Sequence, residues 1–363
     1  MAKKLESHIG ECTKRYEAWL ASLIPLIEED VRLKHSRMKK ALFPFMRATF
    51  YRWAEVWPEV CRDLCSAPEA LSVGDLHIEN FGTWRDSDGR LIWGVNDFDE
   101  VAWLPYTQDL TRLVASANMA IDAESIALDR KNACEAVLAG YRKGIEAGGK
   151  PFVLAEGHTA LRAMARHRLE KPEEFWDELN SNPPIERGIP GSARKAIARM
   201  LPHPDVPHVI VHRIAGLGSL GRYRFAGIGD WKGGRIAREA KELAPSACVW
   251  ASGGKRSTRI LYQEMLDRAV RCPDPWVRVR GRWIVRRLSP DCSRIDLSKL
   301  PKQRDEVRLL QAMGWEAANV HLGTAKARDI LKDLKKRPHG WLYSAASQMV
   351  DAATSDWARW RKH

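Results

Sequence analysis

The stretch VGDLHIENFGTW, from Val73 to Trp84, concentrates polar chemistry in a short space. An aspartate, a histidine, a glutamate and an asparagine fall within six positions, directly after a valine and a glycine. A cluster of this kind suits a metal site, a loop that carries a general base, or an ordinary polar turn. The segments around it decide between these interpretations, and they also bear on why it lies so near the beginning of a long chain.

Asp75 and Asn80 lie five residues apart. The catalytic loop of protein kinases, H-R-D-x-x-x-x-N, has the same interval: its aspartate accepts the proton of the acceptor hydroxyl and its asparagine binds magnesium. The interval alone is a weak signal, because it recurs by chance. A second element strengthens it, since Asn96-Asp97-Phe98-Asp99 lies where kinases carry a magnesium-binding Asp-Phe-Gly segment. We therefore predict Asn80 and Asp97 as magnesium ligands, with Asp99 as a further candidate.

The flanking segments predict mainly helices, with strands in the middle of the chain. Residues 11–70 have the apolar spacing of helices with breaks. RDSDGR (85–90) lies between FGTW and LIWGV, which is typical of a β-hairpin. Residues 106–147 predict about two helices, and the last 60 residues return to helical spacing. Repeated proline and glycine within 181–208 mark the best candidate for a domain boundary, and strand-like runs follow it.

A glycine motif lies far downstream of the opening stretch. Gly216, Gly218 and Gly221, with Ser219 between them, fit G-x-G-x-x-G. A dinucleotide-binding fingerprint needs a helix after the motif, but here HVIVHRI before it and RYRFAGI after it are both strand-like. Strand, glycine loop and strand is the arrangement that covers the phosphates in kinases. Arg222 and Arg224 are unusual neighbours for such a loop, although their charge suits phosphates.

A kinase-like lobe also needs a lysine on its third strand and a glutamate on the helix that follows. Lys241 lies 20 residues after Gly221 and is the candidate lysine. Glu264, in STRILYQEMLDRAV, is the candidate glutamate, and Gln263 is the alternative partner. A glutamine would replace the ion pair with a hydrogen bond only.

Composition limits the other possibilities. The 363 residues suit one large or two medium domains, and no apolar run of about 18 residues predicts a membrane span. Seven scattered cysteines without a CxxC pair, and no apolar leader, favour a reducing cytoplasm. The net charge of +13 and 15 tryptophans allow a nucleic-acid-binding protein. We favour that interpretation least, because Trp53, Trp57 and Trp93 have the spacing of core residues and no nucleic-acid-binding motif is evident.

Together these residues resemble the uncharacterised bacterial family labelled domain of unknown function (DUF) 2252. The resemblance covers most of the chain and rests on SRMKKALFPFMRATF, GDLHIENFGTW, VNDFDEVAWLPYTQDLTRLVAS, GLGSLG and AKELAPSA. The opening stretch is also similar to the G-D-x-H-x-x-N loop of aminoglycoside phosphotransferases and related small-molecule kinases. The resemblance implies that His77 shapes the loop rather than moving protons. It also implies that Asp109, in TQDLTRL, is a helix-start carboxylate that supports the loop.

The chain order departs from that of ordinary kinases, in which the glycine loop comes first. Asp75 precedes Gly216 by about 140 residues, so we predict an α+β, bilobal, kinase-like fold that is circularly permuted. Residues 1–205 would form the first part of a large, mostly helical lobe, and 206–295 a β-rich small lobe. Residues 296–363 would complete the large lobe, with the helix around GWEAANVHL leading spatially into the Asp75 stretch.

The predicted function is ATP- and Mg²⁺-dependent phosphoryl transfer to an unknown small-molecule acceptor. Asp75 would be the base, Asn80, Asp97 and Asp99 would hold magnesium, and Lys241 with the glycines would grip the phosphates. Two alternatives keep the fold: nucleotidyl (AMP) transfer, or nucleotide binding without turnover as in a pseudokinase. A nucleic-acid-binding protein is the third possibility. We expect no membrane partner, and the sequence does not name the acceptor.

Overall fold

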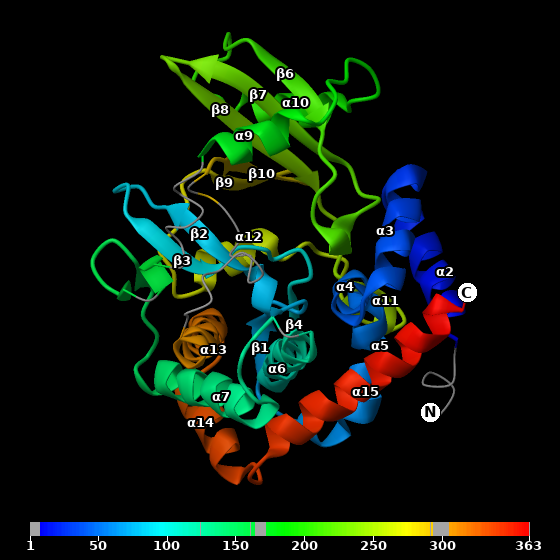
Figure 1. Ribbon diagram of the computed structural model, residues 1–363, viewed down its shortest axis with the longest axis vertical. Helices are drawn as coiled ribbons and strands as arrows, with labels where there is room; N and C mark the ends of the chain where they lie inside the picture. Colours follow the sequence, from blue (N-terminus) through cyan, green and yellow to red (C-terminus); the bar gives the residue numbers. More distant parts are fainter. Residues whose placement is uncertain are drawn as a thin grey trace.

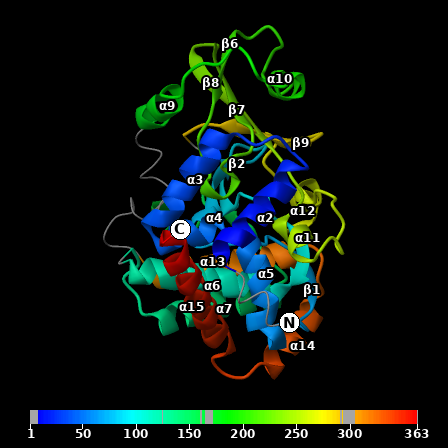
Figure 2. The same ribbon diagram turned by 90° about the vertical axis from the view of Figure 1, so that its right-hand side faces the viewer.

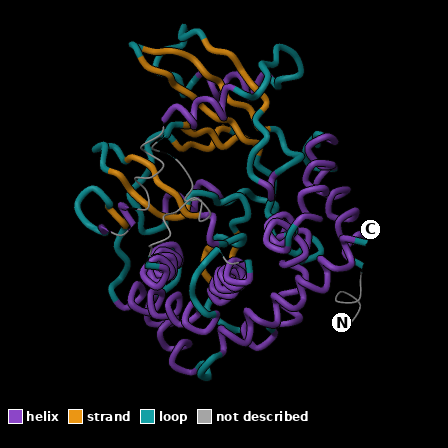
Figure 3. Tube along the Cα trace, viewed as in Figure 1, coloured by secondary structure: helices purple, strands orange, loops and turns teal. Residues whose placement is uncertain are grey.

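The computed structural model describes residues 8–123, 125–159, 161–163, 172–290, 292 and 305–362. The fold is of the α+β class (Figure 1). A five-stranded sheet lies at one end, helices lie at the other, and two small sheets lie between them (Figure 3). None of the helices in the described part of the chain is long and apolar enough to cross a membrane.

The five-stranded sheet is antiparallel, with the order β6-β7-β8-β10-β9. Its strands are β6 (His208–His212), β7 (Arg224–Trp231), β8 (Gly234–Glu242), β9 (Val277–Arg280) and β10 (Trp283–Leu288). The glycine loop, residues 216–221, connects β6 to β7 and contains the short 3-10 helix η3 (Leu217–Ser219). The strands predicted on both sides of the glycine motif are therefore confirmed.

Both faces of this sheet bury apolar side chains, because successive residues of a strand point to opposite faces. The helices α9 (Pro172–Asn180) and α10 (Gly191–Ala198) lie on opposite sides of it (Figure 2). Ile197 of α10 packs with Phe225 and Trp283, and Leu179 of α9 packs with Ile228 on the other face. The predicted boundary at 205/206 would separate these helices from the sheet they cover, and the predicted boundary at 295/296 lies outside the described residues.

The helical part is arranged around α6 (Tyr106–Asp122), whose side chains are buried from Tyr106 to Ala120. α6 contacts α7 (Arg130–Glu146) and α15 (Trp341–Arg361), and α7 packs along α13 (Glu306–Leu322). Glycines allow the α7–α13 approach: a Cβ atom at Gly140 would overlap the carbonyl of Gln311, and one at Gly314 would overlap that of Val137. The remaining helices are α2 (Ile9–Ala21), α3 (Glu28–Lys40), α4 (Leu42–Ala48), α5 (Phe50–Val60), α11 (Ala247–Ala251), α12 (Tyr262–Arg268) and α14 (Ala327–Lys336), with the 3-10 helix η1 (Arg62–Leu64).

Two small sheets frame the opening stretch. β2 (Phe81–Arg85) pairs with β3 (Leu91–Val95), which confirms the predicted hairpin, and β3 also pairs with β5 (Phe152–Val153). β1 (Glu69–Ser72) pairs with β4 (Ala102–Pro105), which leads directly into α6. Between β1 and β2 lie residues 73–80, here called the Asp75 loop, which end in the 3-10 helix η2 (Ile78–Asn80).

Most other sequence expectations for secondary structure agree with the fold. The helices before residue 60, the two helices within 106–147 and the C-terminal helices are confirmed. Trp53, Trp57 and Trp93 are buried, as their spacing predicts. β8 includes two arginines in its N-terminal half, Arg235 and Arg238. Its charges are tolerated because Arg235 is exposed, whereas Arg238 stacks on Trp276.

Candidate functional site

The backbone of the Asp75 loop is held from α6. The Asp109 carboxylate accepts hydrogen bonds from the amides of Val73 (2.7 Å) and Gly74 (2.9 Å). This confirms the supporting role expected for Asp109. Gly74 has φ +78°, and a Cβ atom there would overlap the Glu100 carbonyl, so only glycine fits this turn without strain.

The other polar residues of the loop stabilise its turn. The Asn80 side-chain amide donates to the carbonyl of Asp75 (2.6 Å), which leaves its amide oxygen for another partner. His77 is buried, and its Nδ1 accepts the amide of Glu79 (3.2 Å). His77 thus shapes the loop, as the sequence resemblance implies.

Asp75 is paired with a buried cation that the sequence analysis did not identify. Arg112 of α6 is fully buried and donates from Nε (2.7 Å) and Nη2 to Oδ1 of Asp75. The guanidinium lies 5.0 Å from the ring centroid of Phe50 and 4.8 Å from that of Trp53. Oδ1 is therefore held in place, and Oδ2 is the oxygen left to act as an acceptor.

The electrostatic environment of Asp75 favours a base that works near neutral pH. Burial raises the pKa of Asp75 to about 6, and the charge of Arg112 opposes this effect. A carboxylate with this pKa stays largely ionised at pH 7, yet is more basic than an exposed aspartate.

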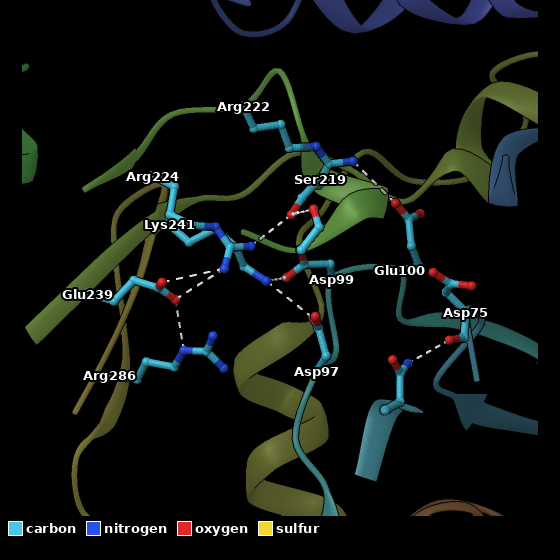
Figure 4. Close-up of polar contacts among 12 residues, drawn as sticks. Asp75, Asp97, Asp99, Glu100, Ser219, Arg222, Arg224, Glu239, Lys241 and Arg286 are labelled. Carbon is cyan, nitrogen blue, oxygen red and sulfur yellow. Dashed lines mark hydrogen bonds and ion pairs between the residues drawn. The ribbon is translucent and has the colours of Figure 1, made fainter. Parts of the chain in front are cut away.

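Asp97 and Asp99 share a lysine from the five-stranded sheet. Lys241 is buried, and its Nζ lies 3.2 Å from an oxygen of Asp97 and 2.6 Å from one of Asp99. Figure 4 shows the ammonium group between the two carboxylates. Burial and the neighbouring charge of Asp97 both raise the pKa of Asp99. Lys241 lies on β8, the third strand of its sheet in chain order.

The glycine loop lies directly over the Asp75 loop. A Cβ atom at Gly218 would be 3.6 Å from Oδ2 of Asp75. The carbonyl of Gly218 accepts a hydrogen bond from Lys34 of α3 (3.3 Å), and that of Gly221 accepts the amide of Ile27 (2.8 Å). Leu217 packs among apolar side chains of α3 and α4. The N-terminal helices therefore hold this loop in place.

Charged side chains reinforce the glycine loop from below. Arg224 donates to the hydroxyl of Ser219 (2.8 Å), and a Cβ atom at Gly216 would lie only 2.8 Å from the same guanidinium nitrogen. Gly216 also has φ +74°, so both space and backbone geometry favour glycine there. At the end of the loop, Arg222 pairs with Glu100 (3.2 Å), the residue after Asp99.

These segments converge on one pocket although they are far apart in sequence. Its lining includes four predicted polar residues, Asp75, Asn80, Asp97 and Asp99, and three of the glycine loop, Gly216, Gly218 and Ser219. Gly221 and Lys241 do not line it, but Lys241 contacts the carboxylates of Asp97 and Asp99, which do.

The predicted partner of Lys241 is wrong. Glu264 of α12 pairs with Arg259 (2.9 Å) and Arg268 (3.2 Å), two largely exposed arginines. The alternative, Gln263, bonds to Asp267 and to the amide of Val279. Lys241 has its charge neutralised by Asp97 and Asp99 instead. The helix was expected at the right place, but its orientation depends on tertiary packing.

Two further cations that the sequence did not indicate, Lys34 and Arg47, line the pocket itself. Burial lowers the pKa of Lys34 to about 8, so it is mostly protonated at neutral pH. Arg47 pairs with Glu79 of the Asp75 loop. Only Arg112 has a sequence signal: it lies three residues after Asp109, so both fall on one face of a helix.

The oxygen atoms of Asp97, Asp99 and Asn80 suit magnesium, which prefers carboxylate and amide oxygens together with phosphate and water. Among the described residues, no group of three or more His, Cys, Asp and Glu side chains is arranged to hold a metal ion. Magnesium bound with a phosphorylated substrate usually has few protein ligands, because phosphate and water oxygens occupy its other coordination positions. Two carboxylates and one amide agree with this. The residues therefore fit a magnesium ion that is bound together with a phosphorylated ligand.

A family model matches part of the chain. Residues 26–174 match a family model described as an uncharacterized protein conserved in bacteria (DUF2252). Neither the curated proteins nor the solved structures contain a match to the chain. The matched segment includes the Asp75 loop and residues 96–99, whereas the glycine loop and Lys241 lie beyond it. The part of this chain that carries Asp75, Asn80, Asp97 and Asp99 is thus similar to that bacterial family.

Proposed function

We propose that this protein is an ATP- and magnesium-dependent phosphotransferase that acts on a small-molecule acceptor. The proposal is carried by one observation: the Asp75 loop, residues 97–99 and the glycine loop meet in one pocket, although about 140 residues separate the first from the last. Each segment has a matching role in phosphoryl transfer by kinases.

The roles follow from the contacts of each side chain. Oδ2 of Asp75 accepts the proton of the acceptor hydroxyl, while Arg112 fixes the other oxygen. Asp97, Asp99 and Asn80 hold magnesium, which, when bound, neutralises charge on the phosphates. Lys241 keeps the two carboxylates together. The backbone amides of the glycine loop cover the transferred group from above.

A circularly permuted, kinase-like fold is part of the proposal. One argument for this fold is the position of Lys241. It lies on the third strand of a sheet whose first strand comes just before the glycine loop, as the corresponding lysine does in kinases. The end of α13 lies beside β1, where Thr324 accepts the amide of Leu71 (2.8 Å), so a helix leads in space, though not in sequence, toward the Asp75 loop. Ile9 of α2 and Trp360 of α15 belong to one apolar cluster, so the first and last described helices lie together, as a permuted order of the elements requires.

Two neighbouring cavities of different size are available to the ligands. The pocket at Asp75 has a volume of about 40 Å³, enough for a transferred group but not for a nucleotide. A second cavity of about 610 Å³ lies next to it and shares Gly216 and Arg47 with it. The larger part of the nucleotide or of the acceptor therefore fits the second cavity rather than the pocket at Asp75.

The first test is thermal unfolding of the wild type and of Asp97→Asn, with ATP and magnesium together and each alone. A ligand at 100 times its Kd stabilises the folded state by about 2.7 kcal/mol, which raises the midpoint by a few degrees for a chain of this size. We expect a shift that needs both ATP and magnesium and is lost in Asp97→Asn.

Asp88→Asn is the matched control, because Asp88 is 73% exposed and is not among the residues that line the pocket. It should keep the full shift. A wild-type protein that is not stabilised by any nucleotide with magnesium would refute the proposal.

Nucleotidyl transfer is the second candidate. It is favoured by the arginines Arg213 and Arg286, which line the larger cavity rather than the pocket at Asp75 and offer phosphate partners on that side. Mass spectrometry of the modified acceptor distinguishes the two reactions, because one adds a phosphoryl group and the other a nucleoside monophosphate.

A further inference from the structure

One face of the five-stranded sheet changes character along its length. On the α9 side the outer part is apolar, with Val211, Ala226, Ile228, Ala237 and Leu288 packed together. Two residues further along the strands, at positions that share this face, the side chains are Arg213, Arg224, Glu239 and Arg286. The change occurs where the sheet meets the larger cavity.

Three arginines converge on one glutamate at this place. Glu239 is fully buried and accepts hydrogen bonds from Arg213 (2.5 Å), Arg286 (2.8 Å) and, more weakly, Arg224 (3.4 Å). The three guanidinium groups hold the pKa of Glu239 well below its usual range, so Glu239 is ionised. A single negative charge balances three positive charges, which leaves an excess of two among these four side chains. Figure 4 shows two of the arginines, Arg224 and Arg286, at Glu239.

An excess of buried positive charge is costly unless an anion compensates it. Arg224 is 4% exposed and is also used by Ser219, so it serves mainly to connect the cluster to the glycine loop. Arg213 and Arg286 are 20% and 18% exposed and line the cavity. Each is anchored to Glu239 through one nitrogen, so its other guanidinium nitrogens can donate hydrogen bonds to a ligand in the cavity.

The other charged residues of the cavity lining add no net charge, because two arginines and two glutamates balance. Arg37 and Arg47 line the cavity together with Glu79 and Glu178. Glu79 is neutralised by Arg47, and Glu178 is exposed. Among the described residues, Arg37 has no acidic partner within ion-pair distance. Counting the five arginines, the two glutamates of the lining and Glu239 behind them, the cavity has a formal charge of +2.

We propose that this cavity, the arginine pocket, binds the phosphate groups of a ligand that carries at least two phosphates. Guanidinium groups fixed at one nitrogen match the paired oxygens of phosphates, and a volume of about 610 Å³ is in the range of small-molecule sites. The ligand is either the nucleotide itself or a phosphorylated acceptor. That the arginine pocket binds phosphates does not depend on the proposed function. Whether those phosphates belong to the nucleotide or to the acceptor rests on the proposed function.

Calorimetric titration with inorganic tripolyphosphate, without magnesium, tests the proposal. We expect saturable binding to the wild type, weakened at least tenfold in Arg213→Gln/Arg286→Gln. Arg37→Gln, a change at a half-exposed helix position that leaves Glu239 and its partners in place, should weaken binding several-fold. Arg328→Gln is the matched control, because Arg328 is 82% exposed and lies outside the pocket, so it should bind like the wild type.

Thermal unfolding of each variant without ligand shows whether the variant is folded. If Arg37→Gln and Arg213→Gln/Arg286→Gln fold and bind tripolyphosphate as tightly as the wild type does, the proposal is overturned. A wild type that does not bind tripolyphosphate overturns it as well.

Two further measurements identify the source of the phosphates. Competition between tripolyphosphate and magnesium-ATP would show that the nucleotide's phosphates occupy the arginine pocket, and simultaneous binding would assign the pocket to the acceptor. Asp97→Asn should keep binding tripolyphosphate without magnesium, since Asp97 does not line the arginine pocket. Failure of the magnesium-ATP site is thus distinguishable from failure of the arginine pocket.

Discussion

Asp75 and Asp99 are both carboxylates at one pocket that pair with a buried cation, but the two pairs are built differently. Asp75 is bound by Arg112, which lies 37 residues away on the helix that also supports the backbone of the loop. Asp99 is bound by Lys241, which lies on a sheet far along the chain and also contacts Asp97. The first pair belongs to one structural unit, and the second pair joins two units.

The Asp75–Arg112 and Asp99–Lys241 pairs therefore differ in how far their partners can move relative to each other. Asp75, Asp109 and Arg112 move together, because Asp109 and Arg112 are neighbours on α6. Asp97 and Lys241 stay in contact only while the five-stranded sheet keeps its position over the Asp75 loop. Asp75 is therefore held within the helical part, whereas the positions of Asp97 and Asp99 depend on how the five-stranded sheet packs against that part.

Loss of the base should have the largest effect. Under the proposed function, Asp75→Asn should reduce ADP release from magnesium-ATP by about 10²- to 10⁴-fold, the usual contribution of a general base. The magnesium-ATP shift in thermal unfolding should persist, because Asp75 is not a metal ligand in the proposal. If Asp75→Asn releases ADP at the wild-type rate, Asp75 is not the base.

Removal of Arg112 should mainly affect folding. Arg112→Met leaves a buried carboxylate without its cation, and the loss of one partner of a buried ion pair costs about 3–5 kcal/mol. Urea denaturation measures this change in the free energy of unfolding. The double variant Asp75→Asn/Arg112→Met should recover part of the loss, because no unpaired charge remains. If Arg112→Met and the double variant Asp75→Asn/Arg112→Met are equally stable, the ion pair between Asp75 and Arg112 contributes little to the free energy of unfolding.

The pKa of Asp75 predicts a pH dependence. Because the base must be deprotonated, ADP release should fall about tenfold per pH unit below about 6 and level off above it. Stability should change with pH in the opposite direction to ADP release. The reason is that the raised pKa makes the folded state bind the Asp75 proton more tightly than the unfolded state does. The contribution of Asp75 to the free energy of unfolding should thus decline as the pH rises from about 4 to about 6. An acid limb centred near pH 4 would contradict the raised pKa.

Glu264→Gln should have the smallest effect. Its ion pairs involve arginines that are 68% and 54% exposed, so we expect a change in stability of less than about 0.5 kcal/mol. The magnesium-ATP shift should remain unchanged. Lys241→Met is the contrasting variant, since it leaves Asp97 and Asp99 without their shared cation, and it should abolish the shift. Loss of the shift in Glu264→Gln would mean that this glutamate contacts Lys241 in solution.

Local patterns were sufficient for much of the fold. The hairpin between β2 and β3 follows from a turn between two apolar runs. The strands around the glycine loop follow from apolar and β-branched residues on both sides of it. That Asp75, Asn80 and Asp97 lie near one another can also be predicted from the sequence, because one loop and one hairpin connect these residues.

The tertiary structure decided which distant charges meet. The sequence cannot show that Lys241 contacts Asp97 and Asp99 rather than Glu264, because the direction of α12 depends on what it packs against. The convergence of Arg213, Arg224 and Arg286 on Glu239 likewise requires the register of four strands. Spacing along the chain fixes side chains that share one helix, strand or turn, whereas contacts between elements depend on the packing of the whole chain.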